Sequence, residues 1–311
     1  MAGSTGPQHL ILQYPISNSY RLSKEQQIEL YPEKKEQIEA FFLRKSKKSC
    51  TFAVTCRLTM ELSAEQKELV RLNSRITKRF HKACAGYGLI ADGDHILIGL
   101  SGGKDSLALV ELLGKRARVH VPSFRVSAIH VRVKERDYLT DTGYLERFCA
   151  EYNVPLHVVD TQITDMPDKH QPKDPCFLCS WYRRKAMFDL AQELECNKIA
   201  LGHHQDDLVE TFLMNILFQG AVATIPPVLH MDKMPITMIR PLCLIPEQDI
   251  ARYAQLRNYQ KQTKLCPFEH VSSRAKVKGL ISQLQTLNPE VRETLYAAMG
   301  NIKNDYLPHL L

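Results

Sequence analysis

The spacing of hydrophobic residues changes near residue 60. Residues 64–85 place hydrophobic side chains at helical intervals, which predicts one long amphipathic helix. These side chains are Leu69, Leu72, Ile76 and Phe80. Ser63 and Gln66, three residues apart, predict a capping box at the start of this helix. Residues 1–59 show only a weak amphipathic stretch over 24–42, which is followed by a basic run at 44–48, so we expect a poorly structured N-terminal extension.

From residue 95 onward, short apolar runs alternate with amphipathic stretches. The predicted strands are 95–100, 126–131, 156–160, 198–201 and 238–242. The predicted helices are 104–117, 140–152, 180–194, 206–218, 247–257, 275–286 and 290–299. This alternation indicates an α/β fold with a doubly wound parallel sheet and a helical C-terminal part. Ligands of such sheets bind at the carboxyl ends of the strands, so the residues that follow each strand are the candidate site.

Composition and charge narrow the class of protein. Hydrophobic residues make up 44% of the 311 residues, and no apolar run approaches the length that spans a bilayer, so we expect no membrane association. The net charge is +7, of which nine Lys/Arg and five Glu in residues 1–59 supply +4. The charge therefore permits an RNA partner without demanding one. Nine scattered cysteines are typical of a reducing, cytoplasmic setting and not of a disulfide framework.

The first predicted strand runs into a glycine-rich loop and then a helix. The loop residues are Ser101, Gly102, Gly103, Lys104, Asp105 and Ser106. The two glycines let the backbone turn sharply, and the N–H groups at the start of the next helix favour an anion. The serine hydroxyls and the Lys104 ammonium add donors. This order predicts a phosphate or pyrophosphate site, although the spacing is not that of a Walker A loop.

A pair of cysteines, Cys176 and Cys179, stands at the start of a predicted helix, where a thiolate is favoured. Cys266 is the natural third ligand of a metal centre. Three cysteines leave one iron of a [4Fe–4S] cluster open, because such a cluster normally takes four ligands. A zinc site that adds His270 to the three cysteines is the alternative.

A second polar group follows the strand predicted at 198–201. Residues 202–211 read Gly-His-His-Gln-Asp-Asp-Leu-Val-Glu-Thr. Asp206 and Glu210 share one helix face because they lie four residues apart. One carboxylate of this group can hold Mg²⁺ on ATP phosphates, and another can act as a base or an electrostatic partner. Helix-dipole stabilisation alone would account for the aspartates but not for the histidines.

These motifs carry a family resemblance. The sequence SGGKDS after a first strand resembles the PP-loop of the N-type ATP pyrophosphatases, which implies ATP cleavage between the α- and β-phosphates. SGGKDS, C-x-x-C, GHHxDDxxETxxMN and a distal cysteine, in this order, resemble the tRNA 2-thiocytidine synthetase family, TtcA. The resemblance covers about residues 60–311. It implies an N-terminal helix in 60–94, a PP-loop ATPase domain in 95–260 and a C-terminal helical part in 261–311.

The resemblance also implies roles for particular residues. The expected catalytic residues are Asp105, Arg183 and Asp206: Arg183 would stabilise charge during adenylation with Asp206 in support, and Asp105 would bind ATP and Mg²⁺. The expected nucleotide-binding set is Ser101, Gly102, Gly103, Lys104, Asp105, Ser106, His130, Gly202 and Asp207. The expected cluster ligands are Cys176, Cys179 and Cys266. The implied reaction replaces the C2 oxygen of an anticodon-loop cytidine in tRNA with sulfur from a donor system of the cysteine desulfurase type.

The distal motif departs from the family pattern. Glu269 stands where a fourth cysteine is often found, and Cys266-Pro267-Phe268 followed by Arg274 is similar to the related 2-thiouridine synthetases. The sequence therefore leaves the target base open between cytidine and uridine, and it leaves a homodimer open. Two further alternatives are a PP-loop ligase without a cluster and an RNA-binding protein without catalysis. The cysteine set argues against the first, and the acidic 202–211 segment against the second.

Overall fold

The computed structural model describes residues 63–134, 138–163, 175–232, 234–260, 262–264 and 273–306. The chain divides into two units, residues 1–67 and 68–311, and the second unit holds the fold and the site described below. The expected extension over 1–59 and the expected cluster ligand Cys266 lie outside the described residues. Within the described helices, none is long and apolar enough to cross a membrane.

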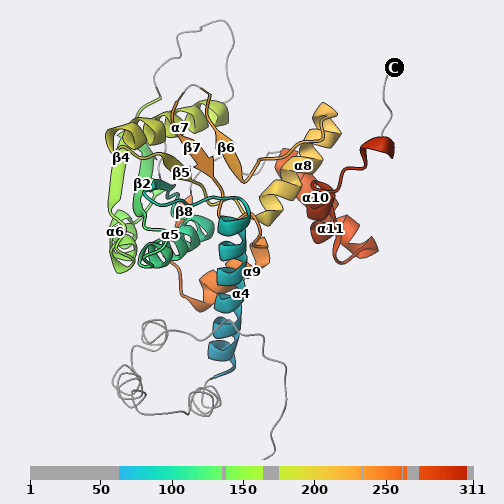
Figure 1. Cartoon of the computed structure of the whole chain (residues 1–311), viewed down its shortest axis with the longest axis horizontal. Helices are drawn as coiled ribbons and strands as arrows, with labels where there is room; N and C mark the ends of the chain where they lie inside the picture. Colours follow the sequence, from blue (N-terminus) through green and yellow to red (C-terminus); the bar gives the residue numbers. More distant parts are fainter. Residues whose placement is uncertain are drawn as a thin grey trace, which may run out of the picture. The chain divides into compact units, whose positions relative to one another are not determined.

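A six-stranded sheet lies at the centre of the second unit (Figure 1). Its strands are β1 (His95–Gly99), β2 (Arg125–Val133), β4 (Leu156–Thr161), β5 (Lys198–Ala200), β6 (Val228–His230) and β7 (Thr237–Ile239). Their order is β4-β2-β1-β5-β7-β6, and every neighbouring pair is parallel except β6 with β7. The chain builds outward from β1 to β4 and then resumes at β5 on the other side of β1. The doubly wound sheet is thus confirmed, with its switch point between β1 and β5.

The predicted helices are present with ends shifted by a few residues. They are α4 (Ala64–Gly86), α5 (Lys104–Ala117), α6 (Thr142–Glu151), α7 (Pro175–Glu193), α8 (Gln205–Gln219), α9 (Glu247–Leu256), α10 (Ser273–Leu287) and α11 (Val291–Ala298), followed by the 3₁₀ turn η2 (Asn304–Tyr306). The capping box of α4 is confirmed, because the Ser63 amide donates to Gln66 Oε1 at 2.9 Å and the Gln66 amide to Ser63 Oγ at 3.2 Å.

Both faces of the sheet are covered, because side chains alternate along each strand. Ile96 and Ile98 of β1 join a buried cluster with α4, α5, α6 and α9, whereas Leu97 joins a second cluster with α7. Figure 1 shows α5 and α6 on one side of the sheet and α7 on the other. The apolar run of β1 shows no alternation because its first four positions are all buried, whichever face of the sheet they point to.

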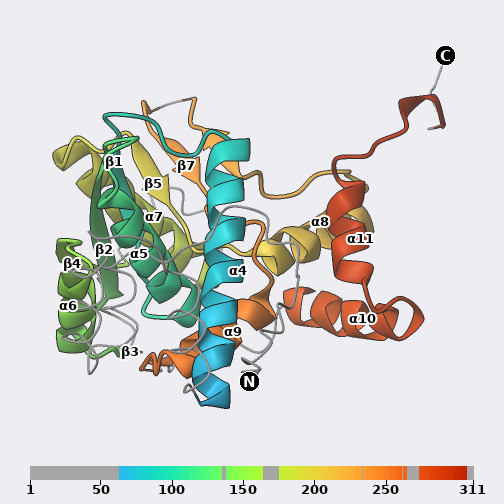
Figure 2. The ribbon, with the colours of Figure 1, turned by 60° about the horizontal axis from the view of Figure 1, so that its bottom comes forward.

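The C-terminal helices pack on α8. Figure 2 shows α10 and α11 beside it, and Val277 and Ile281 of α10 are buried with Val209 of α8 in a third apolar cluster. A short ladder was not predicted from the sequence: β3 (Tyr138–Leu139) pairs antiparallel with β8 (Thr263–Lys264). Helix α5 begins after β1, and α8 begins after β5, so both helices start at the carboxyl ends of these two strands. Helices α10 and α11 pack beside α8 near the same ends.

Candidate active site

The loop after β1 is shaped for an anion. Gly102 has a φ of +79°, a left-handed conformation that favours glycine, and Gly103 is the N-cap of α5. The Gly103 amide donates to Ser101 Oγ at 3.3 Å, and Ser106 Oγ donates to the Gly103 carbonyl at 2.9 Å. Because Gly103 has no side chain, it cannot cap the first amides of α5. The first amides of this helix are therefore left to a ligand.

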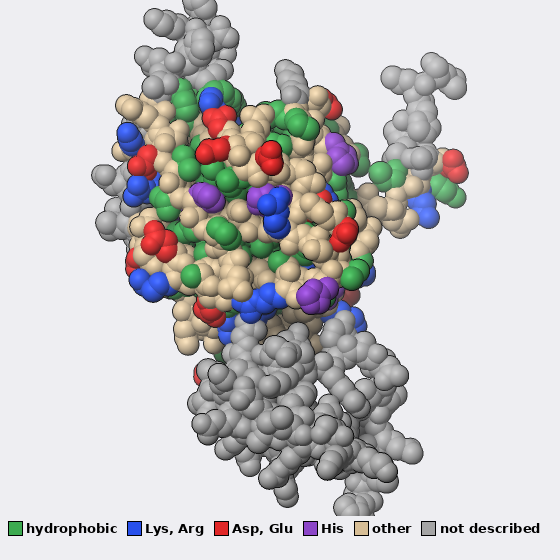
Figure 3. Space-filling model, turned by 60° about the vertical axis from the view of Figure 1, so that its left-hand side comes forward, with side chains coloured by type: hydrophobic (Ala, Val, Ile, Leu, Met, Phe, Trp, Pro, Cys, Tyr) green, Lys and Arg blue, Asp and Glu red, His purple; other side chains and the backbone are tan. Residues whose placement is uncertain are grey.

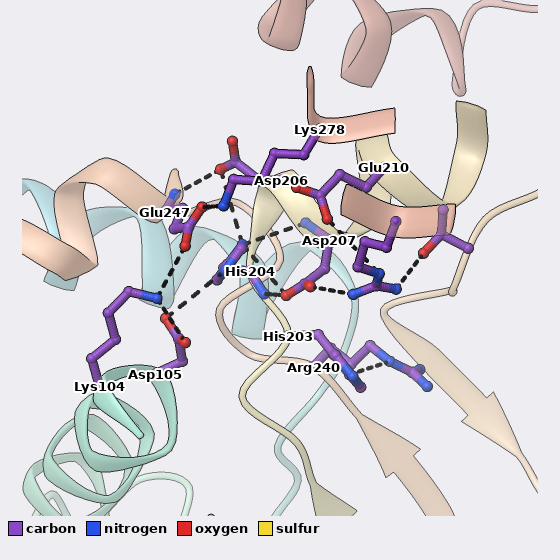
Figure 4. A network of polar contacts seen from close by, with 12 residues as sticks. Lys104, Asp105, His203, His204, Asp206, Asp207, Glu210, Arg240, Glu247 and Lys278 are labelled. Carbon is purple, nitrogen blue, oxygen red and sulfur yellow. Dashed lines mark hydrogen bonds and ion pairs between the residues drawn. The ribbon is translucent and has the colours of Figure 1, made fainter. Parts of the chain in front are cut away.

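Two charged residues follow at the start of α5. Lys104 Nζ lies 3.0 Å from Asp105 Oδ2 and 3.2 Å from Glu247 Oε1, so the lysine is shared between two carboxylates (Figure 4). Burial alone would lower the pKa of Lys104, but these carboxylates raise it, and the side chain is a cation. Asp105 Oδ1 is buried and has no hydrogen bond to any described residue; His204 Nε2 lies 3.9 Å away. One carboxylate oxygen is thus available for a ligand.

The segment after β5 lies directly against this loop. A Cβ built at Gly202 would lie 3.2 Å from the Asp105 carbonyl carbon and 3.2 Å from the Ser106 amide nitrogen. The absence of a side chain at Gly202 is what lets the two strand ends approach. His204 then caps α8: its amide donates to Asp207 Oδ2 at 3.0 Å, and its Nδ1 accepts from the Asp207 amide at 3.4 Å.

Asp206 is buried and is bound through both oxygens. Its Oδ2 accepts from the Glu247 amide at 2.6 Å, and its Oδ1 accepts from Arg292 Nη1 at 2.6 Å. The carboxylate thereby joins α8 to the start of α9 and to α11. The structure gives Asp206 a positioning role, and its expected support of catalysis stays a prediction.

His203 is held by Arg240, which follows β7. Arg240 Nε donates to His203 Nδ1 at 3.2 Å (Figure 4). A guanidinium has no acceptor, so Nδ1 must accept and the neutral ring carries its proton on Nε2. Burial lowers the pKa of His203 to about 4. The negative charge of Asp207 opposes this shift, and the positive charge of Arg240 adds to it. His203 is therefore a neutral N–H donor near neutral pH.

Basic side chains from α10 and α11 complete the site, and the sequence reasoning missed most of them. Arg274 Nη1 lies 2.8 Å from Asp207 Oδ1, and its Nη2 donates to Thr211 Oγ1 at 3.2 Å. Lys278 Nζ lies 2.6 Å from Glu247 Oε2. In the sequence, Arg274 stands out only as part of the motif after Cys266, and Glu247 and Lys278 belong to no local pattern.

His130 and Arg183 lie at the neighbouring strand β2. His130 Nδ1 donates to the carbonyl of Leu100, the residue before the loop, at 2.8 Å. Burial lowers the pKa of His130, and Arg183 of α7 contributes to this through its charge. The structure thus brings Arg183 near His130 and ties His130 to the loop. Contact of either residue with a nucleotide stays a prediction.

The cysteines are described in part. Cys179 is a free, half-buried thiol in α7. Cys176 lies in the first turn of α7, and its side chain, like the whole of Cys266, lies outside the described part of the chain. Among the side chains that are described, no three His, Cys, Asp or Glu residues converge as metal ligands. The geometry of the expected cysteine triad therefore stays a prediction.

Fold and site together define a PP-loop protein: a strand, an anion-binding SGGKDS loop and a helix at the switch point of a doubly wound sheet. The PP-loop domain family matches residues 69–262. A tRNA-cytidine(32) 2-sulfurtransferase from Methylococcus capsulatus is 33% identical over 242 residues, which cover 76% of this chain and 83% of that protein. The chain belongs to the tRNA-cytidine(32) 2-sulfurtransferase family.

Further comparisons agree with this assignment. The enzyme of the same name from Shewanella oneidensis is 33% identical over 245 residues, which cover 78% of each chain. Among solved structures, the U34-tRNA thiolase NcsA from Methanococcus maripaludis, described with its [4Fe–4S] cluster, superposes with a TM-score of 0.62 at 25% identity. That match covers 76% of this chain and 83% of NcsA.

Proposed function

We propose that this chain is an ATP-dependent tRNA sulfurtransferase. The C2 oxygen of a cytidine in the anticodon loop attacks the α-phosphorus of ATP, and pyrophosphate leaves. Sulfur then takes the place of the adenylated oxygen, and AMP leaves. The observation that carries the proposal is the close approach of Gly202 to Asp105 and Ser106, which joins the PP-loop to the His203–Asp207 segment. Three relatives that share 32–33% identity with the chain bear the name of this activity.

ATP would lie with its pyrophosphate on the loop. The amides after Gly103 and the hydroxyls of Ser101 and Ser106 would donate to phosphate oxygens, and Lys104 would pair with their charge. The free Oδ1 of Asp105 fits a Mg²⁺ ligand, and Asp207 is the second candidate. Bound Mg²⁺ would neutralise part of the phosphate charge.

Arg183 and Asp206 are the proposed catalytic pair. Arg183, near His130 on the neighbouring strand, would stabilise the negative charge that develops on the α-phosphate. Asp206 would support it through the position of α8, since both of its oxygens are held. His130 and Gly202 shape the wall of the same nucleotide site.

Cys176, Cys179 and Cys266 would hold a [4Fe–4S] cluster. The free thiol of Cys179 lies within the first two turns of α7, where the helix dipole favours a thiolate, and this fits a cluster ligand. When bound, the cluster would supply the chemistry that hands sulfur to the activated base. We propose a cytoplasmic enzyme that receives its sulfur from a cysteine desulfurase type of donor, because cluster thiolates need a reducing setting.

A second candidate is the thiolation of uridine. Two observations favour it: Cys266-Pro267-Phe268 with Arg274 in the sequence, and the structural likeness to a thiolase named for U34. The site chemistry is the same for both bases, because each presents a C2 carbonyl.

The test is thiolation of unmodified tRNA by the full chain, purified without oxygen, with ATP, Mg²⁺ and sulfide. Nucleoside mass spectrometry should show 2-thiocytidine; 2-thiouridine would move the assignment to the second candidate. Cys176→Ala should abolish both the iron–sulfur absorption and thiolation, whereas Cys84→Ala, which removes a half-buried thiol of α4, should change neither. A colourless protein with about one zinc and no thiolated base would overturn the proposal.

A further inference from the structure

Beyond its first turns, which carry Glu65 and Glu68, helix α4 has basic side chains and no acidic ones. Residues 69–86 contain five Lys or Arg and no Asp or Glu. With 34 acidic residues in 311, a stretch of this length would hold about two. Four of the five, Arg71, Arg75, Lys78 and Lys82, are exposed. At 100° per residue they fall within an arc of about 60°, and they extend over about 16 Å of the helix. We call them the α4 basic face.

The buried face of α4 points elsewhere. Leu72, Ile76, Phe80 and Ala83 pack into the core on the opposite part of the helix circumference. The α4 basic face is therefore the part that is turned to solvent. By contrast, acidic and basic side chains are interspersed on the surface drawn in Figure 3, which is the ordinary arrangement for a solvated surface.

The arrangement is unfavourable for the helix by itself. Arg71 with Arg75, and Lys78 with Lys82, are like-charge pairs at i,i+4, and each such pair costs a helix about 0.2–0.5 kcal/mol. The charge of Arg75 is compensated by a bidentate contact with Asp249. Arg75 Nε donates to Oδ2 at 2.8 Å, and Arg75 Nη2 donates to Oδ1 at 2.6 Å. Arg71 and Lys82 have no carboxylate partner among the described residues. A helix that keeps such repulsion on one face is suited to an external anion.

Neighbouring arginines add to this surface instead of neutralising it. Arg79 Nη1 donates to the carbonyl of Leu244, and Arg116 Nη2 of α5 donates to the carbonyl of Val121. A carbonyl carries no net charge, so both guanidinium charges persist. Arg116 lies close to His81 of α4. Partial burial is the larger cause of the lowered pKa of His81, and the positive charge of Arg116 is the second. Positive charge from two helices thus gathers here.

We propose that the α4 basic face binds the phosphate backbone of the tRNA substrate, outside the nucleotide site. This inference rests on the proposed function, which supplies the polyanion. Regular cationic spacing along a helix suits the repeating phosphates of a nucleic acid, whereas a protein partner would need apolar contacts at the centre of its interface. The interior of the face lies beside the start of α9, since Arg75 pairs with Asp249, and α9 begins with Glu247 of the active site. Substrate RNA held along α4 would thus pass next to the element that leads into the site.

The test is binding of unmodified tRNA to the full, cluster-loaded protein, measured by fluorescence anisotropy over a range of salt concentrations. The variant Arg71→Gln with Lys82→Gln removes two charges and keeps good helix formers. We expect its Kd to rise about 5- to 10-fold at low salt. The slope of log Kd against log salt should fall by about 1.4–1.8, as for two lost phosphate contacts.

A matched control removes two exposed charges elsewhere: Lys185→Gln on α7 with Lys303→Gln, which should leave Kd and slope unchanged. The charge-conserving variant Arg71→Lys with Lys82→Arg should bind as the wild type does. ATP binding should be the same in all four proteins, which checks their fold. Equal tRNA affinity and salt slope in the wild type and the Gln variant would overturn the proposal that the α4 basic face binds tRNA. A wild type that binds tRNA through this face but makes no thiolated base would overturn the proposed function alone.

Discussion

Gly202 approaches Asp105 so closely that an added methyl group would be crowded against main-chain atoms: its Cβ would lie 3.2 Å from the Asp105 carbonyl carbon and 3.3 Å from the carbonyl oxygen. These are main-chain atoms of the PP-loop and cannot rotate away. We expect Gly202→Ala to push the loop apart and to weaken ATP binding about tenfold or more, with an unfolding cost of about 1–3 kcal/mol. Isothermal titration with a non-hydrolysable ATP analogue measures the first effect, and thermal unfolding the second.

A matched control for this prediction is Gly279→Ala. Gly279 lies inside α10, and a Cβ there would meet no atom within 4 Å. The same added methyl should stabilise the helix by about 0.5–1 kcal/mol and leave ATP binding unchanged. Equal ATP affinity in Gly202→Ala and Gly279→Ala would show that the close approach is unimportant for the nucleotide site.

Glu247 should make stability depend on pH. Burial alone would raise its pKa, but Lys278 and Lys104 outweigh burial and lower it to about 2 from 4.5. A depressed pKa in the folded state contributes stability that is present above about pH 4.5 and is lost as the pH falls towards 2. Glu247→Gln should therefore cost about 2 kcal/mol at pH 7 and much less at pH 3. Urea unfolding at the two pH values measures the difference.

The control for that experiment is Glu293→Gln, at an exposed acid of α11. Its effect on unfolding should stay within about 0.5 kcal/mol at both pH values. A constant difference between Glu247→Gln and the wild type from pH 7 to 3 would contradict the ion-pair account.

His203 should titrate far below an ordinary histidine. Its Nδ1 accepts from Arg240, and burial lowers its pKa to about 4. Nitrogen-detected NMR should show the Nε2–H tautomer above about pH 5 and protonation near pH 4. Because the folded pKa is depressed, the group contributes to the loss of stability as the pH falls from about 6.5 to 4. Arg240→Gln should raise the pKa and remove the tautomer preference; titration of His203 near 6.5 in the wild type would contradict the geometry.

Glu111 should be the most costly acid to remove outside the site. It is fully buried in α5 and accepts hydrogen bonds from the hydroxyls of Tyr253 and Tyr259 and from Lys115 at 2.8 Å. Glu111→Ala leaves these donors and Arg257 buried without their acceptor, so we expect a loss of about 3–5 kcal/mol. Chemical denaturation measures it. Glu68→Ala, which breaks an exposed pair with Arg252, should leave the unfolding midpoint nearly unchanged.

The sequence predicted the sheet and the two central motifs because each leaves a local signal. The strand at β1 is a continuous apolar run, and α5 begins at Lys104 as expected because glycines stand before it. The pair β3 and β8 was missed because two-residue strands carry no periodicity. β6 was missed for a similar reason, as three residues after a double proline give no strand signal.

The partners of the acidic segment could not be predicted in the same way. Lys278 meets Glu247 from 31 residues away, and Arg292 meets Asp206 from 86 residues away. An ion pair between distant segments requires only a complementary charge and imposes no spacing on the sequence. Their identity emerges once the packing of α10 and α11 against α8 is known.

The basic residues of α10 and α11 also bear on the order in which the protein becomes competent. A nascent chain that has emerged as far as the end of α9 already holds the PP-loop, the histidines and Glu247. It still lacks Arg274, Lys278 and Arg292, which balance the charges of Asp207, Glu247 and Asp206. The carboxylates without their cations and the phosphates of ATP are both negatively charged, so they would repel each other. We therefore expect tight nucleotide binding only after α10 and α11 have docked, so that protection by ATP against proteolysis reports this docking.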